Sequence, residues 1–127
     1  MNDSTFKTWL DAYGRAWETR DPEAAADLFT EGATYQETPF LEPERGRPAI
    51  HQYWLNATQG QDDIEFGYEI LSVTEDQGIA RWWVSFTVAA QTLIQLDGIF
   101  LVVMAEGDRC KEFREWWHQQ AKPVAPA

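Results

Sequence analysis

The chain has 127 residues, a formal net charge of −11 and a single cysteine. This length supports one domain with a real hydrophobic core and is too short for two ordinary domains. The strong negative charge, without any basic stripe, argues against nucleic acid or an anionic membrane surface as the main partner. Both of these partners select for clustered Lys and Arg.

The cysteine count and the N-terminal residues bear on location. The lone Cys110 excludes an internal disulfide and fits a reducing compartment. No basic segment followed by an apolar run is evident at the N-terminus. The longest apolar run, 99–105, is far shorter than the roughly 20 residues that cross a bilayer. We therefore expect a cytoplasmic domain without a membrane partner.

Two helices are expected at the start of the chain. Large apolar residues recur at spacings of three and four and predict a helix over 4–20, with Ser4 as its N-cap. The run Asp21-Pro22-Glu23 then places a capping acid before a proline at the first helical position. This run predicts a second, short helix over 22–29.

A strand, a loop and a third helix follow. A strand is expected over 33–38, stopped by Pro39, and 40–45 is expected to be a polar loop. Gly46-Arg47-Pro48 begins the third helix. The apolar face of that helix carries Ile50, Tyr53 and Trp54.

The apolar period changes from about 3.6 to 2 in the second half of the chain, which indicates strands. The expected strands are 64–74, 79–90, 93–104 and 109–119. Short turns between such strands predict an antiparallel meander. The sequence thus predicts a single α+β domain over 1–121, three helices and then a curved antiparallel sheet, with a disordered tail over 122–127.

The last predicted strand carries aromatic residues on both faces, and one of those faces also holds a carboxylate. Side chains alternate across a sheet, so Phe113, Glu115 and Trp117 share one face. Burial of Glu115 between two large aromatic residues is costly unless the carboxylate is paired. This arrangement indicates a lined cavity.

Both faces of the later strands are rich in apolar residues. Three short helices cannot cover both sides of such a sheet. We therefore expect one face to enclose the helices and a cavity, and the outer face to meet a second copy of the chain, which makes a homodimer.

The order of these elements resembles the nuclear transport factor 2-like superfamily, and specifically its SnoaL-like branch. The resemblance covers nearly the whole chain. It rests on Trp17 with Asp21-Pro22-Glu23, Leu28-Phe29, 33–39, 46–50 with Tyr53-Trp54, 96–100 and 113–117. It implies a cone-shaped, cystatin-like α+β fold with a cavity between helices and sheet, usually in a dimer. Members include isomerases, cyclases, dehydratases, hydrolases and non-catalytic carriers, so the fold does not fix the function.

Ketosteroid isomerase is a distant member that offers a test, because it pairs a carboxylate base with an oxyanion site of Tyr and protonated Asp. Counted along the resemblance, the Tyr position falls on Tyr13, which matches. The base position falls on Thr38 and the oxyanion acid on Phe100, which do not match. A one-residue bulge would put Glu37 in place of Thr38. We therefore expect no close relationship to ketosteroid isomerase.

The same counting orients the sheet and selects the candidate site. It turns Arg81, Trp83, Ser85 and Thr87 inward together with Phe113, Glu115 and Trp117, and it leaves Asp97 on the outer face. The candidate catalytic residues are Glu115, Glu37 and Tyr13. The candidate ligand-binding residues are Arg81, Trp17, Trp54, Trp83, Phe100 and Trp117.

Each candidate has a structural alternative. An ion pair between Glu115 and Arg81 would keep both ionised without catalysis, although Arg81 could instead bind a ligand carboxylate. Tyr13 could be a core residue with a bonded hydroxyl, and Glu37 could cap the loop. No His, Cys and Asp cluster has metal-ligand spacing, so neither a metal nor a cofactor is expected.

Three functions are consistent with these residues. The first is an enzyme that transfers a proton (isomerase, cyclase or dehydratase) on a hydrophobic small molecule, with Glu115 or Glu37 and the Tyr13 hydroxyl. The second is a non-catalytic binder or carrier with the same cavity. The third is an interaction module whose apolar sheet face binds a different protein.

Overall fold

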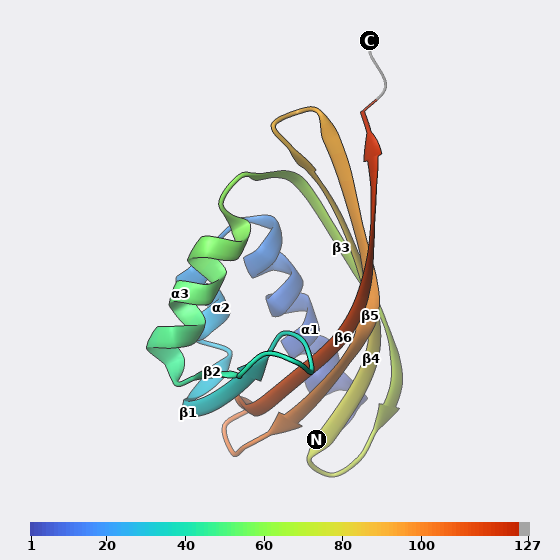
Figure 1. Cartoon of the computed structure of the whole chain (residues 1–127). Helices are drawn as coiled ribbons and strands as arrows, with labels where there is room; N and C mark the ends of the chain where they lie inside the picture. The colour runs from blue at the N-terminus through green and yellow to red at the C-terminus, as the bar shows by residue number, and fades with distance from the viewer. Residues whose placement is uncertain (125–127) are drawn as a thin grey trace.

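The computed structural model describes residues 1–124 and shows six strands curved around three helices (Figure 1). The helices are α1 (Asp3–Glu18), α2 (Pro22–Ala26) and α3 (Arg47–Thr58). The strands are β1 (Phe29–Gln36), β2 (Glu44–Arg45), β3 (Gln61–Val73), β4 (Gln77–Val88), β5 (Thr92–Met104) and β6 (Cys110–Pro123). They lie in the order β2-β1-β6-β5-β4-β3, which confirms the predicted α+β fold.

Helix α1 begins at Asp3, and its N-cap lies two residues before the one that the sequence indicated. The Asn2 side chain caps it and accepts a hydrogen bond from the Thr5 N–H at 2.8 Å, so the predicted cap at Ser4 is wrong. Asn2 satisfies one of the free N–H groups that every helix leaves at its start. The predicted apolar stripe is confirmed. It is buried at Phe6, Trp9, Leu10, Tyr13 and Trp17.

Helix α2 starts as predicted but is shorter. The Asp21 side chain accepts from the Ala24 N–H at 3.0 Å, and Pro22 is the first helical residue. The helix ends at Ala26 because the following residues join the sheet: the Cys110 N–H donates to the Leu28 carbonyl at 2.8 Å. Sequence periodicity does not reveal this long-range pairing, so the prediction extended the helix into the start of β1.

The sheet is mixed rather than wholly antiparallel. Strands β3 to β6 form the predicted antiparallel meander. Strand β1, however, pairs in parallel with β6, with Tyr35 opposite Phe113. The expectation of a purely antiparallel sheet is wrong at this edge, because the chain returns to β1 only after the whole meander.

Strand β6 is longer than predicted. It pairs with β5 through Lys122 and Pro123, and the Val124 N–H donates to the Gln91 carbonyl at 2.8 Å. The strand therefore includes two residues of the expected tail. The rest of that tail, 125–127, lies outside the described residues.

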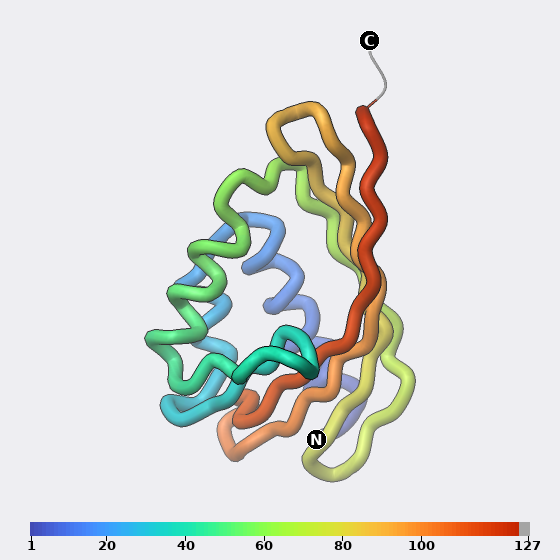
Figure 2. The backbone as a smooth tube through the Cα atoms, viewed as in Figure 1, coloured from blue at the N-terminus to red at the C-terminus, as the bar shows by residue number. Residues whose placement is uncertain are grey.

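Both long helices lie on the same side of the sheet, and no layer formed by residues 1–124 covers the other side (Figure 2). The helix side is the hydrophobic core. From β4 it receives Ala80, Trp82, Val84 and Phe86, and from β5 it receives Phe100, Val102 and Met104. From β6 it receives Phe113 and Glu115, with Trp117 partly buried beside them.

The predicted orientation is confirmed for β6 and wrong for β4. Trp82 is 1% exposed, whereas Arg81 and Trp83 lie on the outer face, as do Ser85 and Thr87. Strand β4 carries apolar side chains on both faces, so its own pattern could not show which face points toward the helices. Packing fixes that face: Ala80 pairs with Phe100, and Trp82 stacks on the Phe100 ring at 4.8 Å.

Candidate functional site

Glu115 is the charged residue that the fold buries most completely among the described residues, at 5% exposure. It follows Phe113 on the inner face of β6, and Phe100 is its partner across β5. Its Oε2 atom is buried and has no hydrogen-bond partner. An ionised, unpaired carboxylate would be very costly here, so burial favours the protonated acid.

The pKa of Glu115 is raised well above its usual value, first by burial and then by the negative charge of Glu37. A hydrogen bond with Tyr35 lowers this pKa and offsets part of the rise. No basic group contributes to the shift. Burial therefore favours the protonated form of Glu115, which is the form that the proton donor of an acid-base reaction needs.

Two tyrosine hydroxyls lie beside this acid. The hydroxyls of Tyr13 on α1 and Tyr35 on β1 are 3.0 Å apart and buried. Burial, and after it the charge of Glu115, raises the pKa of both tyrosines well above the usual value. Both hydroxyls therefore remain neutral and can donate a hydrogen bond.

Glu37 and Tyr53 connect this buried group to the surface. Glu37 follows β1, and its backbone carbonyl accepts a hydrogen bond from Trp117 Nε1 at 3.0 Å. Burial raises the pKa of its half-buried carboxyl, a hydrogen bond with Tyr53 lowers it, and the charge of Glu44 raises it further. We call Glu37, Tyr53, Tyr35, Tyr13 and Glu115 the carboxyl–tyrosine cluster.

A recess of about 600 Å³ opens beside the outer end of this cluster. Glu37 and Tyr53 line it together with residues of β2 and α3. The full lining is Glu37, Glu44, Ala49, Gln52, Tyr53, Asn56 and Ala57. The cluster therefore reaches from a surface recess to the middle of the core.

Aromatic rings occupy the centre of the space between helices and sheet. The Tyr13 ring lies 5.1 Å from Phe100, 5.3 Å from Trp54 and 5.6 Å from Phe113. Trp17 is buried as well, and its Nε1 donates to Gln61 at 2.8 Å, whereas the Trp54 Nε1 has no partner. The cavity implied by the resemblance is thus filled at its centre by the chain's own side chains.

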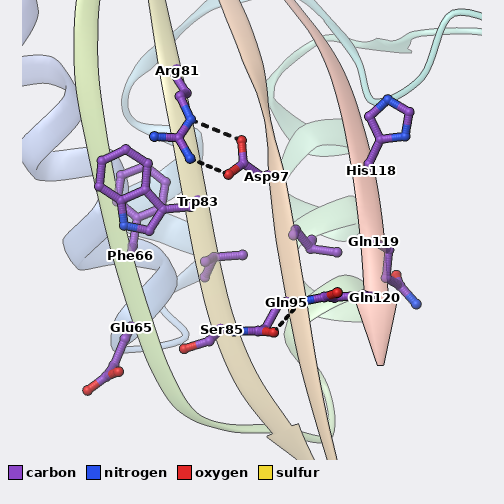
Figure 3. Close-up of a pocket in the computed structure, with 12 residues that line it drawn as sticks. Glu65, Phe66, Arg81, Trp83, Ser85, Gln95, Asp97, His118, Gln119 and Gln120 are labelled. Atoms are coloured by element: carbon purple, nitrogen blue, oxygen red, sulfur yellow. Dashed lines mark hydrogen bonds and ion pairs between the residues drawn. The ribbon is translucent and has the colours of Figure 1, made fainter. Parts of the chain in front are cut away.

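Arg81 and Trp83 lie on the opposite face of the sheet from Glu115. Figure 3 shows them on the outer face of the sheet, where the Arg81 guanidinium forms two hydrogen bonds to the Asp97 carboxylate, one of them at 3.2 Å. The same guanidinium lies over the Trp83 ring, 4.7 Å from its centroid. The predicted ion pair between Arg81 and Glu115 is therefore wrong, and the predicted outer position of Asp97 is confirmed.

The structure brings together Glu115, Glu37 and Tyr13 and surrounds them with Trp17, Trp54, Phe100 and Trp117. It adds Tyr35 and Tyr53, which the sequence analysis did not select. A signal for both existed. Alternation along β1 puts Tyr35 and Glu37 on one face, and the helical period puts Tyr53 beside Ile50 on the inner face of α3.

Two general features complete the description of residues 1–124. They contain no group of three His, Cys, Asp or Glu side chains placed to hold a metal ion. They also contain no helix that is both long enough and apolar enough to cross a membrane.

The family of the chain follows from its sequence and agrees with this geometry. Residues 10–119 match the family model of the SnoaL-like domain. The chain belongs to the SnoaL-like domain family. No curated protein sequence matches it.

Solved structures share the fold of this SnoaL-like domain at low sequence identity. The epoxide hydrolase/cyclase-like enzyme SalBIII, of pyran ring formation in salinomycin, is 16% identical with a TM-score of 0.78, covering 93% of this chain and 95% of its own. Rv0760c from Mycobacterium tuberculosis is 10% identical with a TM-score of 0.82, covering 96% and 99%. The Δ5-3-ketosteroid isomerase of Mycobacterium sp. is 12% identical with a TM-score of 0.78, covering 93% and 98%.

Proposed function

We propose that this SnoaL-like domain binds a hydrophobic small molecule at the carboxyl–tyrosine cluster and transfers a proton on it. Glu115 is the acid and base, and Tyr13 and Tyr35 donate hydrogen bonds to the reacting oxygen. The observation that carries the proposal is the buried Oε2 of Glu115, which has no partner within the chain. Such an atom is costly to keep unless a ligand uses it.

The chemistry follows from the protonation states. Neutral Glu115 gives its proton to a substrate oxygen, and the hydroxyl pair, 3.0 Å apart, stabilises charge that develops on that oxygen. The carboxylate formed in this step then takes a proton from a substrate carbon or from water and returns to its resting state. Isomerisation, cyclisation and dehydration all use this pair of transfers, and the cyclase-like and isomerase structures of the same fold support this class.

The aromatic side chains supply the apolar contacts for the ligand. Trp17, Trp54 and Phe100 surround the cluster, and the Trp117 indole donates a hydrogen bond to the backbone carbonyl of Glu37. The recess beside Tyr53 gives the ligand its approach. Side-chain movement of the packed rings must accompany binding, since they occupy the centre of the site.

A non-catalytic carrier is the second candidate. It is favoured by Thr38, which stands where the resemblance places the carboxylate that ketosteroid isomerases use as base. In a carrier, Glu115 and the tyrosines would only hydrogen-bond the ligand.

Glu115→Gln separates the two candidates. Native mass spectrometry of the purified protein first identifies a retained metabolite, and turnover of that metabolite is then measured. An enzyme loses more than about 100-fold in turnover while binding persists. Glu112→Gln, on the other face of β6, is the matched control. Unchanged turnover in Glu115→Gln would leave Glu115 with a structural role.

We also propose that the outer sheet face binds a second copy of the chain. The charged pair of Arg81 and Asp97 lies among apolar side chains on that face, so two copies related by a two-fold axis are complementary to each other. The apolar members are Ile79, Trp83, Ile99, Leu101, Val103 and Trp116. A cytoplasmic location is consistent with the free thiol of Cys110.

A further inference from the structure

Two indole N–H groups in the core have no hydrogen-bond partner. They belong to Trp54 and Trp82, which are 4% and 1% exposed. The other indoles on the helix side each donate to an oxygen of the chain, at 2.8–3.0 Å, and belong to Trp9, Trp17 and Trp117. A buried indole N–H usually finds an acceptor. The described residues supply none to Trp54 and Trp82.

The two free N–H groups lie on either side of one side chain. The Trp17 ring of α1 is 5.3 Å from the Trp54 ring of α3 and 5.7 Å from the Trp82 ring of β4. Three elements that are distant in the sequence thus bring both unpartnered donors to the same part of the interior. Two separate defects in the packing would have no reason to meet in this way.

This part of the interior borders the carboxyl–tyrosine cluster. The Trp54 ring lies 5.3 Å from the Tyr13 ring. The Trp82 ring stacks on Phe100 at 4.8 Å, and Phe100 lies opposite Glu115 in the sheet. A small molecule that reaches Glu115 and Tyr13 therefore lies beside both indoles.

The chemistry of the two indoles defines what they can bind. An indole N–H only donates, so each needs an acceptor. Phenylalanine would supply a similar apolar surface without leaving a buried donor unpaired. Glu115 is the only charged residue among the buried ones that the structure describes. An ionised oxygen of a ligand would therefore lack a basic partner here, and a neutral oxygen fits better.

We infer that the ligand carries a second, neutral oxygen, of a carbonyl or an ether, which accepts hydrogen bonds from Trp54 and Trp82. This inference rests on the proposed function, in which a first oxygen of the ligand reacts at Glu115 and the tyrosines. The two indoles determine specificity: they select an oxygenated ligand over a hydrocarbon of the same shape, and they fix which end of the ligand faces Glu115.

Two ketones of nearly equal shape test the inference. The dione trans-decalin-1,5-dione has an oxygen at each end of its ring system, and trans-1-decalone has only one. Both are titrated into the full chain by calorimetry. The dione should bind at least about tenfold more tightly, because the monoketone leaves the indole donors unpaired. Equal affinities, tighter binding of the monoketone or no binding of the dione would overturn the inference.

Nuclear magnetic resonance of the isotope-labelled wild type observes the two N–H groups directly. The indole proton signals of Trp54 and Trp82 should move downfield when the dione binds, and the signal of Trp9 should not. This measurement does not depend on the folding of any variant. Unmoved signals, or long-lived water that stays at both N–H groups in the presence of the dione, would overturn the inference.

Variants assign the preference for the dione to the indoles. Trp54→Phe and Trp82→Phe each remove one N–H and keep an aromatic ring, so the ratio of the two affinities should fall by at least about threefold. Trp9→Phe is the matched control, because Trp9 is also buried but its N–H already donates to the Leu28 carbonyl at 3.0 Å. An unchanged ratio in both variants, or an equal fall in Trp9→Phe, would exclude the site.

The outcomes separate this inference from the proposed function. If Glu115→Gln abolishes turnover of a retained metabolite and the two ketones bind equally, only the second oxygen site is excluded. If the dione binds through Trp54 and Trp82 while Glu115→Gln leaves turnover unchanged, only the catalytic role is excluded.

Discussion

At the residue scale, Glu115 lies in the core although one of its carboxyl oxygens has no hydrogen-bond partner. Its exposure of 5% and its unpartnered Oε2 make the ionised form costly, and no cation compensates for it. A stabilising core would hold an apolar residue at this place. Glu115 is therefore the residue on which the proposed function depends most directly.

The pH dependence of stability tests the protonation state of Glu115. Its pKa is raised in the folded chain, so the folded state keeps a proton that the unfolded state releases above a pH of about 4.3. The wild type should therefore lose free energy of unfolding as pH rises from that value toward the raised pKa, whereas Glu115→Gln should not. We expect the difference between the two to grow as pH rises from about 5 to 8, because the unfolded chain binds fewer protons than the folded chain over this range.

Urea denaturation across this pH range measures the effect, with Glu112→Gln as the control on the other face of β6. If the wild type and Glu115→Gln show parallel pH profiles, Glu115 does not hold a proton in the folded chain.

Removal of the Tyr35 hydroxyl should cost more than removal of the Tyr13 hydroxyl. Tyr35 hydrogen-bonds Tyr13 and also lowers the pKa of Glu115, so Tyr35→Phe leaves two buried polar groups without a partner. Tyr13→Phe leaves Tyr35 with its contact to Glu115. We expect about 1–3 kcal/mol of destabilisation for Tyr35→Phe and less for Tyr13→Phe, measured by denaturant unfolding. The reverse order would contradict this network.

At the element scale, β6 is the strand that builds the site. It pairs with β5 along its whole length and with β1 on the other side, so the position of Glu115 depends on two neighbouring strands. Gly98 on β5 lies opposite Trp117. A Cβ atom at Gly98 would overlap the Trp116 carbonyl and would lie 2.8 Å from the Trp117 Cβ.

Gly98→Ala should therefore separate β5 from β6 beside the site. We expect about 1–3 kcal/mol of destabilisation, as for other overpacking changes, measured by thermal and denaturant unfolding. Gly32→Ala on β1 is the control, because a Cβ there meets nothing within 4 Å. Equal stability of the two variants would show that the sheet accommodates the added methyl group.

At the scale of the whole molecule, the outer sheet face exposes large apolar side chains that nothing in a single chain covers among the described residues. Trp83 is 38% exposed and Trp116 is 41% exposed on that face. The helices cover only the opposite side (Figure 2). Exposed aromatic side chains of this kind mark an interaction surface.

Sedimentation at micromolar concentration tests the homodimer. We expect twice the chain mass of 14.6 kDa for the wild type and a folded monomer for Leu101→Lys, because a buried charge in the interface is costly. Leu55→Lys on α3 is the control, since Leu55 is exposed on the helix side. A wild-type species of 14.6 kDa would exclude the dimer, and a complex with a different protein on the same face would favour the third function considered above.

Local signals in the sequence determined the order of the elements, except for the short strand β2, which lies in the predicted loop 40–45. The apolar stripe of α1 and the Asp21-Pro22 start of α2 depend on hydrogen bonds and periods within a few residues, so one sequence suffices to find them. The inner position of Glu115 also followed from alternation with Phe113 and Trp117 on one strand.

Tertiary structure alone decided the inner face of β4. Both sets of side chains on that strand are largely apolar, and only packing against Phe100 fixes which set points inward. It also decided the parallel pairing of β1 with β6, which joins residues about eighty positions apart, and through that pairing it placed Tyr35 beside Tyr13 and Glu115. Contacts between distant segments depend on how whole elements are placed relative to one another. The spacing of residues within one segment does not determine that placement.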